Sequence, residues 1–346
     1  MVNIGIIGAT GYVGIEIIRL LQNHPEVNIS TVVSQSFAGQ KISDIYPSLR
    51  NVFDMECQNL DIDKVAACSD IVITALPHGV SSQVVPEFLK RGKRVIDHSG
   101  DFRYKSVEIY EKWYKTKHHA PELLNEAVYG LPELYRDKIK SAAIVANPGC
   151  YPTCSILGLA PLLSNNLIDT NSIIIDAASG VTGAGRKSEL AYQFCECTEN
   201  FKAYSVSTHR HTSEIEQELG VLAGTDVLVS FTPHLAPMKR GMLSTIYANL
   251  NSKSTTEGLL QVYREFYKDE FFIRVLDNGH FPETKHVSGS NYMDIGLVVD
   301  ERLNRAIILS AIDNLGKGAA GQAVQVLNIM CGFPENTGLT SPAFYL

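Results

Sequence analysis

One cysteine of the chain stands in a setting that would make it reactive. Cys150 lies in residues 147–153, NPGCYPT, between an apolar strand-like run at 142–146 and an apolar helical pattern. A helix that begins here, with Pro152 at its first position, would place Cys150 at its N-terminus. The dipole at that end favours thiolate over thiol, and such sites lower a cysteine pKa from about 8.5 to roughly 3.5–7.5. We therefore predict that Cys150 is a nucleophile that a substrate approaches over Gly149.

The other cysteines carry no comparable signal. Cysteines are usually small buried apolar residues, and this interpretation covers Cys57, Cys68, Cys154 and Cys331. The spacings between cysteines lack the paired C-x2-C pattern of a zinc site, so we expect no metal.

A nucleophile needs a group that gives and takes protons. His209, Arg210 and His211 are consecutive, and Ser213 with Glu216 has the spacing of a helix capping box. This pattern predicts a helix from about Ser213, with the three residues presented in the loop before it. A solvated polar loop is the alternative interpretation. Two histidines and an arginine together favour an anion-binding, proton-transferring site beside the candidate nucleophile.

A glycine-rich turn near the N-terminus could bind a dinucleotide. Gly8, Gly11 and Gly14 follow the apolar run 2–7 and open a helical pattern, with G-x-x-G-x-x-G spacing in place of the usual G-x-G-x-x-G. Such a turn lets backbone N–H groups and the helix N-terminus approach a pyrophosphate. A close-packed strand–helix turn is the alternative. The predicted contacts are Gly8, Ala9, Thr10, Gly11, Tyr12, Val13 and Gly14.

The end of the second apolar run indicates which dinucleotide is bound. Proteins that bind NAD usually carry an acidic residue about 20 residues after the turn, which binds the ribose 2′-hydroxyl. Residues 32–41 contain no carboxylate, but they contain Ser34, Ser36 and Lys41. Hydroxyl groups and a lysine suit a 2′-phosphate, so we predict NADP, with a polar loop of no such role as the alternative.

The elements that must position these residues fall into two groups. Apolar runs alternate with helical patterns in the first third of the chain, at 2–7, 27–33, 71–76, 94–96 and 142–146. Strand-like runs with few helices follow, at 173–177, 227–231, 242–250, 292–299 and 306–312. The alternating pattern of the first group predicts β-α-β units and a parallel sheet, and the pattern of the second group predicts a mixed sheet.

We therefore predict an α/β protein of two domains. A Rossmann-type parallel-sheet domain, which binds NADP, spans 1–149 and 314–346, because the helical pattern after residue 316 is expected to return to it. An α+β catalytic and oligomerisation domain with a mixed sheet spans 150–313. A length of 346 residues suits two domains of ordinary size.

Composition narrows the range of partners. A net charge of −7 disfavours nucleic acid and anionic membranes as partners, and no run of about 20 apolar residues is present. Seven cysteines without a regular framework suit a reducing compartment. We expect a cytoplasmic protein with a small anionic substrate and no nucleic-acid or membrane partner.

Motifs along essentially the whole chain resemble those of the N-acetyl-γ-glutamyl-phosphate reductase family, in the aspartate-semialdehyde-dehydrogenase-like superfamily. The matching segments are 8–14, 101–103, 148–153, 179–187, 209–211, 231–237, 289–291 and 313–321. Glycine directly before the cysteine separates the chain from aspartate semialdehyde dehydrogenases, which have asparagine there.

The resemblance implies roles for individual residues. Cys150 would be the nucleophile and His211 the general acid and base. The residues assigned to substrate binding are Arg103, Asn147, His209 and Arg210, with Arg103 suited to a phosphate by its planar fork of donors. Beyond the glycine turn, Ser34 and Ser36, the residues assigned to the cofactor are Pro77, Ser179, Gly180, Gly183 and Asn314, with Asn314 binding the nicotinamide carboxamide.

The implied reaction belongs to arginine biosynthesis. NADPH would reduce N-acetyl-L-glutamyl 5-phosphate to N-acetyl-L-glutamate 5-semialdehyde and phosphate through a thioester on Cys150. The superfamily also implies a homodimer or homotetramer. Two alternatives stay open. One is a related acyl-phosphate reductase, acting on aspartyl phosphate or a carrier-linked aminoadipyl phosphate; the other is a non-catalytic NADP sensor.

Overall fold

The computed structural model describes residues 1–186 and 188–344, which pack into two units. The first unit comprises Met1–Pro148 and Ala319–Thr340, and the second comprises Gly149–Gly318 and residues 341–344. The predicted domains divide the chain differently at 149, at 314–318 and after 340. Lys187, in the matching segment 179–187, and residues 345–346, in the predicted C-terminal segment, lie outside the described residues.

The first unit contains a six-stranded sheet in which every pairing is parallel, so the predicted Rossmann-type sheet is confirmed. Its order is β2-β1-β3-β4-β6-β5. The strands are β1 Val2–Ile7, β2 Val27–Val33, β3 Ile71–Thr74, β4 Arg94–Asp97, β5 Val128–Tyr129 and β6 Ile144–Ala146. The residues of β3 and β6 are all buried, as continuous apolar runs in a covered parallel sheet should be.

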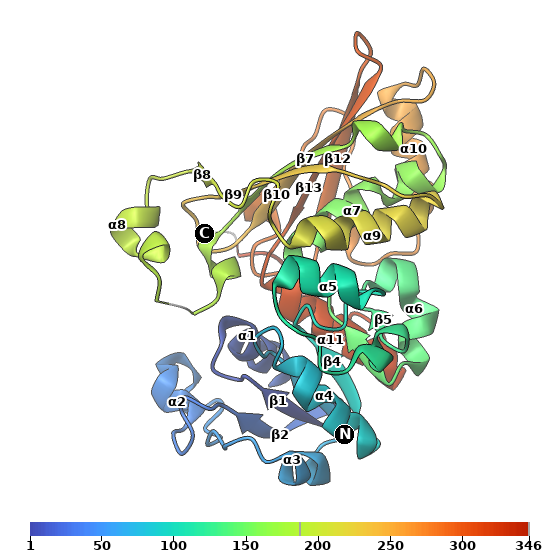
Figure 1. Ribbon diagram of the computed structural model, residues 1–346. Coiled ribbons are helices and arrows are strands. Elements are labelled where there is room, and N and C mark those ends of the chain that lie inside the picture. Colours follow the sequence, from blue (N-terminus) through green and yellow to red (C-terminus); the bar gives the residue numbers. More distant parts are fainter. Residues whose placement is uncertain (187, 345–346) are drawn as a thin grey trace. The chain divides into compact units, whose positions relative to one another are not determined.

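The helices of the first unit are drawn in Figure 1. They are α1 Tyr12–Leu21, α2 Ile42–Ile45, α3 Ile62–Cys68, α4 Ser81–Lys90, α5 Val107–Tyr114, α6 Pro132–Ser141 and α11 Gly321–Cys331, with the 3-10 turns η1 Pro47–Leu49 and η2 Pro121–Asn125. Helices α1, α3, α4, α6 and α11 contact strands of this sheet. The last helix, α11, contacts α1, α6 and β4, and its residues 321–330 are all buried. The C-terminal part of the chain therefore completes the core of the first unit.

The second unit contains a seven-stranded sheet of order β11-β12-β13-β10-β7-β9-β8. The strands are β7 Ile174–Ser179, β8 Lys202–Ala203, β9 Ser230–Leu235, β10 Met242–Asn249, β11 Ile273–Val275, β12 Met293–Asp300 and β13 Arg305–Ile312. Strands β7 and β9 pair in parallel, as do β11 and β12, and the other pairings are antiparallel. The predicted mixed sheet is confirmed.

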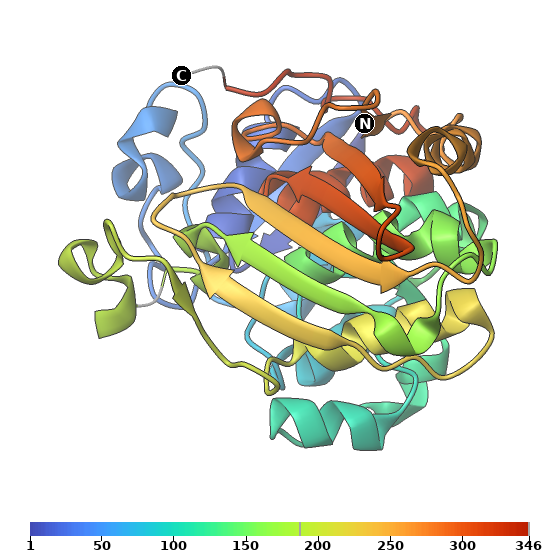
Figure 2. The same ribbon diagram turned by 90° about the horizontal axis from the view of Figure 1, so that it is seen from above.

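Helices α7 and α9 lie on one face of this second sheet (Figures 1 and 2). The helices of the unit are α7 Cys150–Ser164, α8 Phe194–Cys197, α9 His211–Ala223 and α10 Thr256–Phe266. The short turns are η3 Thr170–Ser172, η4 Val181–Ala184, η5 Leu190–Tyr192, η6 Thr284–His286 and the π-helical η7 Gly316–Ala320. Residues 151–163 of α7 are all buried, and α7 contacts α9, α10, β10 and β13. Because packing on several sides fixes the position of α7, the position of its first residue, Cys150, is fixed as well.

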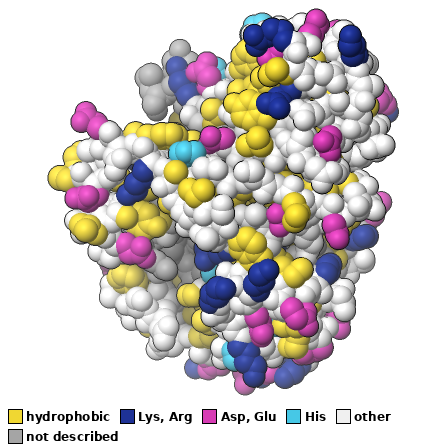
Figure 3. All heavy atoms as spheres, turned by 45° about the horizontal axis from the view of Figure 1, so that its top comes forward, with side chains coloured by type: hydrophobic (Ala, Val, Ile, Leu, Met, Phe, Trp, Pro, Cys, Tyr) yellow, Lys and Arg dark blue, Asp and Glu magenta, His cyan; other side chains and the backbone are white. Residues whose placement is uncertain are grey.

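One face of the molecule is of mixed charge (Figure 3). Figure 3 shows acidic and basic side chains interspersed over the visible face. Within residues 1–186 and 188–344, no helix has the length and apolar character needed to cross a membrane.

Candidate active site

Cys150 is the first residue of α7, so the prediction that it lies at a helix N-terminus is confirmed. Gly149 is the N-cap, with φ −70° and ψ 154°, and the thiol of Cys150 is partly exposed. Pro152 is the third helical residue and not the first as predicted. It is still tolerated, because backbone nitrogens in the first turn have no intrahelical acceptor. Cys68, the last residue of α3, is exposed and Cys331 is partly exposed, so the prediction that they are buried was wrong for both.

The ring of His211 lies against the backbone just before Cys150. A Cβ atom built on Gly149 would lie 2.5 Å from Nε2 and 2.7 Å from Cε1 of His211. No real Cβ fits at such distances, so the contact requires glycine. The sequence suggested that position 149 is glycine so that a substrate can approach Cys150. The close approach of the His211 ring is a second reason for a glycine there. The predicted nucleophile and the predicted general acid and base therefore come together in the second unit.

Glu214 also contacts the residue before the nucleophile. The backbone N–H of Gly149 donates to Glu214 Oε1 at 2.9 Å, and Glu214 is fully buried. Glu214 follows His211 by three positions on α9, and residues at that spacing share a helix face. Sequence reasoning missed Glu214 because it placed the helix start too late; a start at His211 would have exposed this shared face.

Helix α9 begins at His211, so the prediction that all three residues of the cluster precede the helix was wrong for His211. Arg210 is the N-cap, with helical φ −57° and ψ −27°. The expected capping box does not form, because both of its side chains have other partners. Ser213 Oγ donates to Arg210 O at 3.1 Å, and Glu216 Oε1 accepts from the N–H of Val229 at 3.2 Å.

His209 sits among aromatic rings beside His211. The ring centroids of Tyr151 and Tyr204 each lie 5.5 Å from that of His209, and Phe231 lies at 5.6 Å. The ring of His211 is nearer, at 4.8 Å, and its backbone N–H donates to Nδ1 of His209 at 3.1 Å. Nδ1 is therefore an acceptor, and the neutral ring carries its hydrogen on Nε2.

Burial, with a smaller effect of Arg210, lowers the pKa of His209 from 6.5 to about 4. The folded protein then binds fewer protons than the unfolded chain between these values. The contribution of His209 to the free energy of unfolding is therefore complete above pH 6.5 and is lost as the pH falls towards 4. The slope of this loss is up to about 1.4 kcal/mol per pH unit. We expect His209→Gln to flatten this slope in denaturant unfolding at pH 7, 6 and 5. An unchanged slope in the variant would contradict the assignment.

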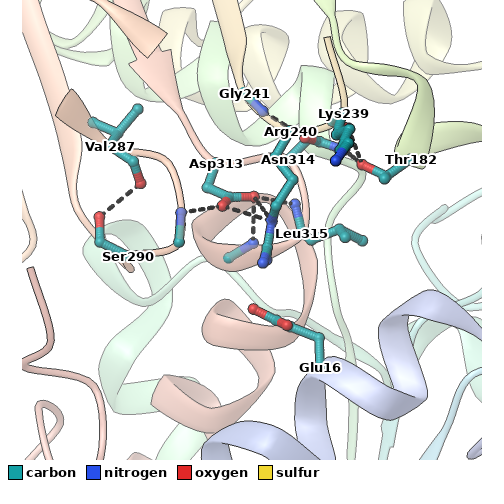
Figure 4. Close-up of polar contacts among 12 residues, drawn as sticks. Glu16, Thr182, Lys239, Arg240, Gly241, Val287, Ser290, Asp313, Asn314 and Leu315 are labelled. Atoms are coloured by element: carbon teal, nitrogen blue, oxygen red, sulfur yellow. Dashed lines mark hydrogen bonds and ion pairs between the residues drawn. The ribbon is translucent and has the colours of Figure 1, made fainter. Parts of the chain in front are cut away.

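A buried ion pair holds the loop that precedes η7 (Figure 4). Asp313 is fully buried and accepts from the N–H groups of Leu315 at 2.8 Å and Gly316 at 3.1 Å. Its other oxygen lies 3.0 Å from Nε of Arg240. The sequence around Arg240 did not predict this ion pair, because Asp313 is distant along the chain and no local pattern connects the two residues.

The predicted nicotinamide residues of the second unit lie close together. A Cβ on Gly183 would be 3.4 Å from Ser179 Oγ and 3.7 Å from Asn314 Nδ2. Asn314 is engaged within the unit, since Oδ1 accepts from the N–H of Gly241 and Nδ2 donates to Thr182 Oγ1, each at 2.9 Å (Figure 4). An amide nitrogen carries two hydrogens, so the bond to Thr182 leaves one donor for a ligand.

Two further glycines of the second unit stand at close approaches. A Cβ on Gly180 would lie 2.7 Å from Lys239 O. A Cβ on Gly318, within η7, would lie 2.8 Å from Cβ of Cys150. The segment after Asp313 therefore reaches the candidate nucleophile. The family resemblance includes this segment, but it predicted no role for Gly318.

The glycine turn of the first unit is as tight as predicted. Gly8 has φ +86°, and a Cβ on it would lie 2.3 Å from Ala75 O. A Cβ on Gly14 would lie 2.4 Å from Gly8 O, so only glycine lets α1 start this close to the turn. Gly11 is the N-cap of α1. The backbone here is shaped like an anion cradle at a helix N-terminus.

The residues predicted to select NADP are only partly brought together. Ser34 Oγ lies 2.7 Å from Thr10 Oγ1, and both residues are buried, so Ser34 belongs to the glycine turn. Ser36 and Pro77 are exposed. They follow β2 and β3, the two strands that flank β1. Their cofactor contacts stay predictions.

The predicted substrate residues belong to two units. Arg103 and Asn147 are buried in the first unit, where Nη2 of Arg103 donates to His98 O at 2.7 Å. Cys150 and His211 are in the second unit, with His209 and the exposed Arg210.

Known proteins match both units. A family model described as semialdehyde dehydrogenase, NAD binding domain, matches residues 3–142, and one described as semialdehyde dehydrogenase, dimerisation domain, matches residues 150–314. The fold agrees with solved structures of that class. Aspartate semialdehyde dehydrogenase II from Vibrio cholerae matches with a TM-score of 0.74 at 18% identity, covering 96% of this chain and 98% of that one. The enzyme from Candida albicans, solved with NADP, matches with a TM-score of 0.73 at 19% identity, covering 97% and 99%.

Curated relatives give the particular family. N-acetyl-gamma-glutamyl-phosphate reductase of Acetivibrio thermocellus is 69% identical over 100% of both chains. Proteins of the same name from Desulforamulus reducens and Pelotomaculum thermopropionicum are 56% and 53% identical, over 100% and 99% of both chains. The chain belongs to the N-acetyl-gamma-glutamyl-phosphate reductase family.

Proposed function

We propose that the chain reduces N-acetyl-L-glutamyl 5-phosphate to N-acetyl-L-glutamate 5-semialdehyde and phosphate with NADPH, a step of arginine biosynthesis. One observation carries the chemistry: a partly exposed Cys150 begins α7, and the His211 ring lies against the adjacent Gly149. A thiol at a helix N-terminus beside an imidazole suits attack on an acyl group. The full-length identity to relatives of this name supports the substrate.

In the proposed mechanism, the thiolate sulfur of Cys150 forms a bond to the acyl carbon of the substrate. The bond from that carbon to the phosphate oxygen breaks, and phosphate leaves with the electron pair. NADPH, when bound, supplies the hydride that reduces the resulting thioester. The carbon–sulfur bond then breaks, which releases the aldehyde and restores the thiolate. A thioester accepts hydride far more readily than a carboxylate, and this is the reason for a covalent route.

Protons and transient charge are assigned to this chain's own groups. The departing phosphate takes one proton, and we assign its delivery to His211, which regains a proton from water. A positioned acid of this kind is worth about 10²–10⁴ in rate. The negative oxygen that forms on the acyl carbon would be stabilised by the N-terminus of α7.

The cofactor site fits NADP in its local shape. The backbone of the glycine turn and the N-terminus of α1 would hold the pyrophosphate. Ser34 and Ser36 would hold the 2′-phosphate. The cofactor's nicotinamide end is assigned to Pro77, Ser179, Gly180, Gly183 and Asn314. The first predicted domain, 1–149 with 314–346, would thus bind NADP.

The second predicted domain, 150–313, would carry catalysis and assembly. We propose a homodimer or homotetramer, and the family model described as a dimerisation domain supports an oligomer. We also place the enzyme in the cytoplasm, since seven cysteines without a regular framework suit a reducing compartment.

The proposed function is tested in the reverse direction. The assay follows NADP reduction with N-acetyl-glutamate semialdehyde and phosphate, and compares NAD and aspartate semialdehyde. We expect kcat/KM to be at least about tenfold higher for the N-acetylated aldehyde and for NADP, a difference of about 1.4 kcal/mol. Equal or faster turnover of aspartate semialdehyde would favour the related-reductase alternative. NADP binding without turnover of any aldehyde would favour the sensor.

A further inference from the structure

His98 and Asn147 occupy matching places at one edge of the first sheet. His98 follows β4, and its backbone N–H donates to Thr74 O at 2.9 Å. Asn147 follows β6, and its N–H donates to Asp97 O at 2.8 Å. Strands β4 and β6 are parallel neighbours. Ligands of open parallel sheets bind beyond the carboxyl ends of the strands, which is where both side chains begin.

The hydrogen bonds of Asn147 determine which nitrogen of His98 carries the hydrogen. Asn147 Nδ2 lies 3.0 Å from Ala319 O and 3.3 Å from His98 Nδ1. A carbonyl oxygen only accepts, so the amide turns its NH2 group towards Ala319 and donates to Nδ1 as well. Burial and then Arg103 lower the pKa of His98 to about 3, so the ring is neutral at pH 7. The hydrogen of the neutral ring is therefore on Nε2.

This Nε2–H group has no acceptor within the described residues. Nε2 of His98 and Oδ1 of Asn147 are both buried atoms without a hydrogen-bond partner in that part of the chain. Buried histidines ordinarily satisfy both nitrogens, as His118 does in the same unit: Nε2 lies 2.8 Å from Asp101 O, and Nδ1 accepts from the N–H of Ala120. Unpaired buried donors are rare and costly, so an unpaired donor and an unpaired acceptor on two residues in contact indicate a ligand.

The neighbouring cation indicates the charge of that ligand. Arg103 is 6% exposed, and its Nη2 donates to the backbone oxygen of His98. A guanidinium group beside a neutral N–H donor suits an oxyanion. The hydrogen phosphate dianion has oxygens for both donors and one hydroxyl group for Oδ1 of Asn147.

We propose that His98 donates its Nε2–H to the phosphate released in the reaction, which binds between Arg103 and Asn147. The inference rests on the proposed function for the identity of the anion, and it names a phosphate-binding residue that no sequence motif indicated.

Two substitutions separate the donor from the rest of the ring. His98→Asn keeps a polar group near the Nδ1 position but removes the donor, whereas His98→Gln places a side-chain N–H near Nε2. In the reverse assay with N-acetyl-glutamate semialdehyde, we expect His98→Asn to raise the KM for phosphate about 10- to 100-fold, the usual weight of a hydrogen bond to a charged group. His98→Gln should restore it to within about threefold, and the KM for NADP should not change. The control is His118→Gln, which should leave the KM for phosphate unchanged.

A wild-type KM for phosphate in His98→Asn would overturn the inference, as would an equal loss in His98→Gln. Calorimetric titration of inorganic phosphate into the enzyme alone separates this inference from the proposed function. Binding that depends on His98 in a protein without reductase activity would sustain the first and refute the second. Should the variants fail to fold, 15N-histidine spectra of the wild type test the inference. The His98 ring, which should have the lowest pKa, must be the Nε2–H tautomer, and its signals must move when phosphate is added.

Discussion

Replacement of Cys150 by alanine is expected to lower kcat/KM by about four orders of magnitude or more, since loss of a covalent nucleophile leaves only positioning and charge stabilisation. NADPH affinity should stay near the wild-type value, because the glycine turn from Gly8 to Gly14 is built within the first unit. The measurements are steady-state reduction of the acyl phosphate and fluorescence titration with NADPH.

The matched control for this variant is Cys154→Ala. Cys154 lies one helical turn further along α7, is fully buried, and has its sulfur 3.3 Å from Ser310 O. We expect this variant to lose stability but to keep its activity. An alkylating reagent should still modify Cys150 in it, and bound acyl phosphate should still protect Cys150 from the reagent. Wild-type turnover in Cys150→Ala would refute the covalent route, whatever the control shows.

Substitution of Gly149 by alanine is expected to lower kcat/KM by about 10²–10⁴, the contribution of a positioned general acid. The added methyl group would collide with the His211 ring, whose Nε2 lies 2.5 Å from the Cβ position. The backbone angles of Gly149, φ −70° and ψ 154°, are ordinary for alanine, so the fold should survive. Kinetics together with thermal unfolding of the variant measure both effects.

A double-mutant cycle tells which neighbour the methyl group disturbs. If it acts by displacing His211, then Gly149→Ala should change kcat/KM by no more than about twofold in a His211→Ala background. A loss of equal size in both backgrounds would show that the methyl group blocks the substrate itself. In that case the contact between Gly149 and His211 would not be what positions the general acid.

Local patterns were enough to predict several elements. The runs at 2–7 and 27–33 coincide with β1 and β2. Strand β1 is mostly apolar, as expected of a buried parallel strand, whereas β2 alternates Val27 and Ile29 with the polar Asn28 and Ser30. The start of α7 followed from Gly149 and Pro152 around Cys150. Strands β5 and β8 were missed, since two residues are too few to show any periodicity.

The start of α9 shows where local signals compete. Ser213 and Glu216 have capping-box spacing, but their side chains bind Arg210 O and the N–H of Val229 instead. The helix therefore begins at His211, and this places Glu214 on the same face as His211. Only the N–H of Val229 comes from outside the helix, whereas Arg210 O lies one turn before Ser213. The capping-box spacing therefore lost to another local bond at Ser213 and to a more distant partner at Glu216.

By itself, the sequence determined the chemistry that each short segment offers: a thiol at a helix start, a glycine turn after the first strand, and a loop without a carboxylate after the second. The tertiary structure decided which of these groups meet. Packing of α7 against α9 brings His211 to Gly149, and Arg240 reaches Asp313 from the loop between β9 and β10. Periodicity reports only which face of an element is buried, whereas contact between distant segments depends on how whole helices and strands pack.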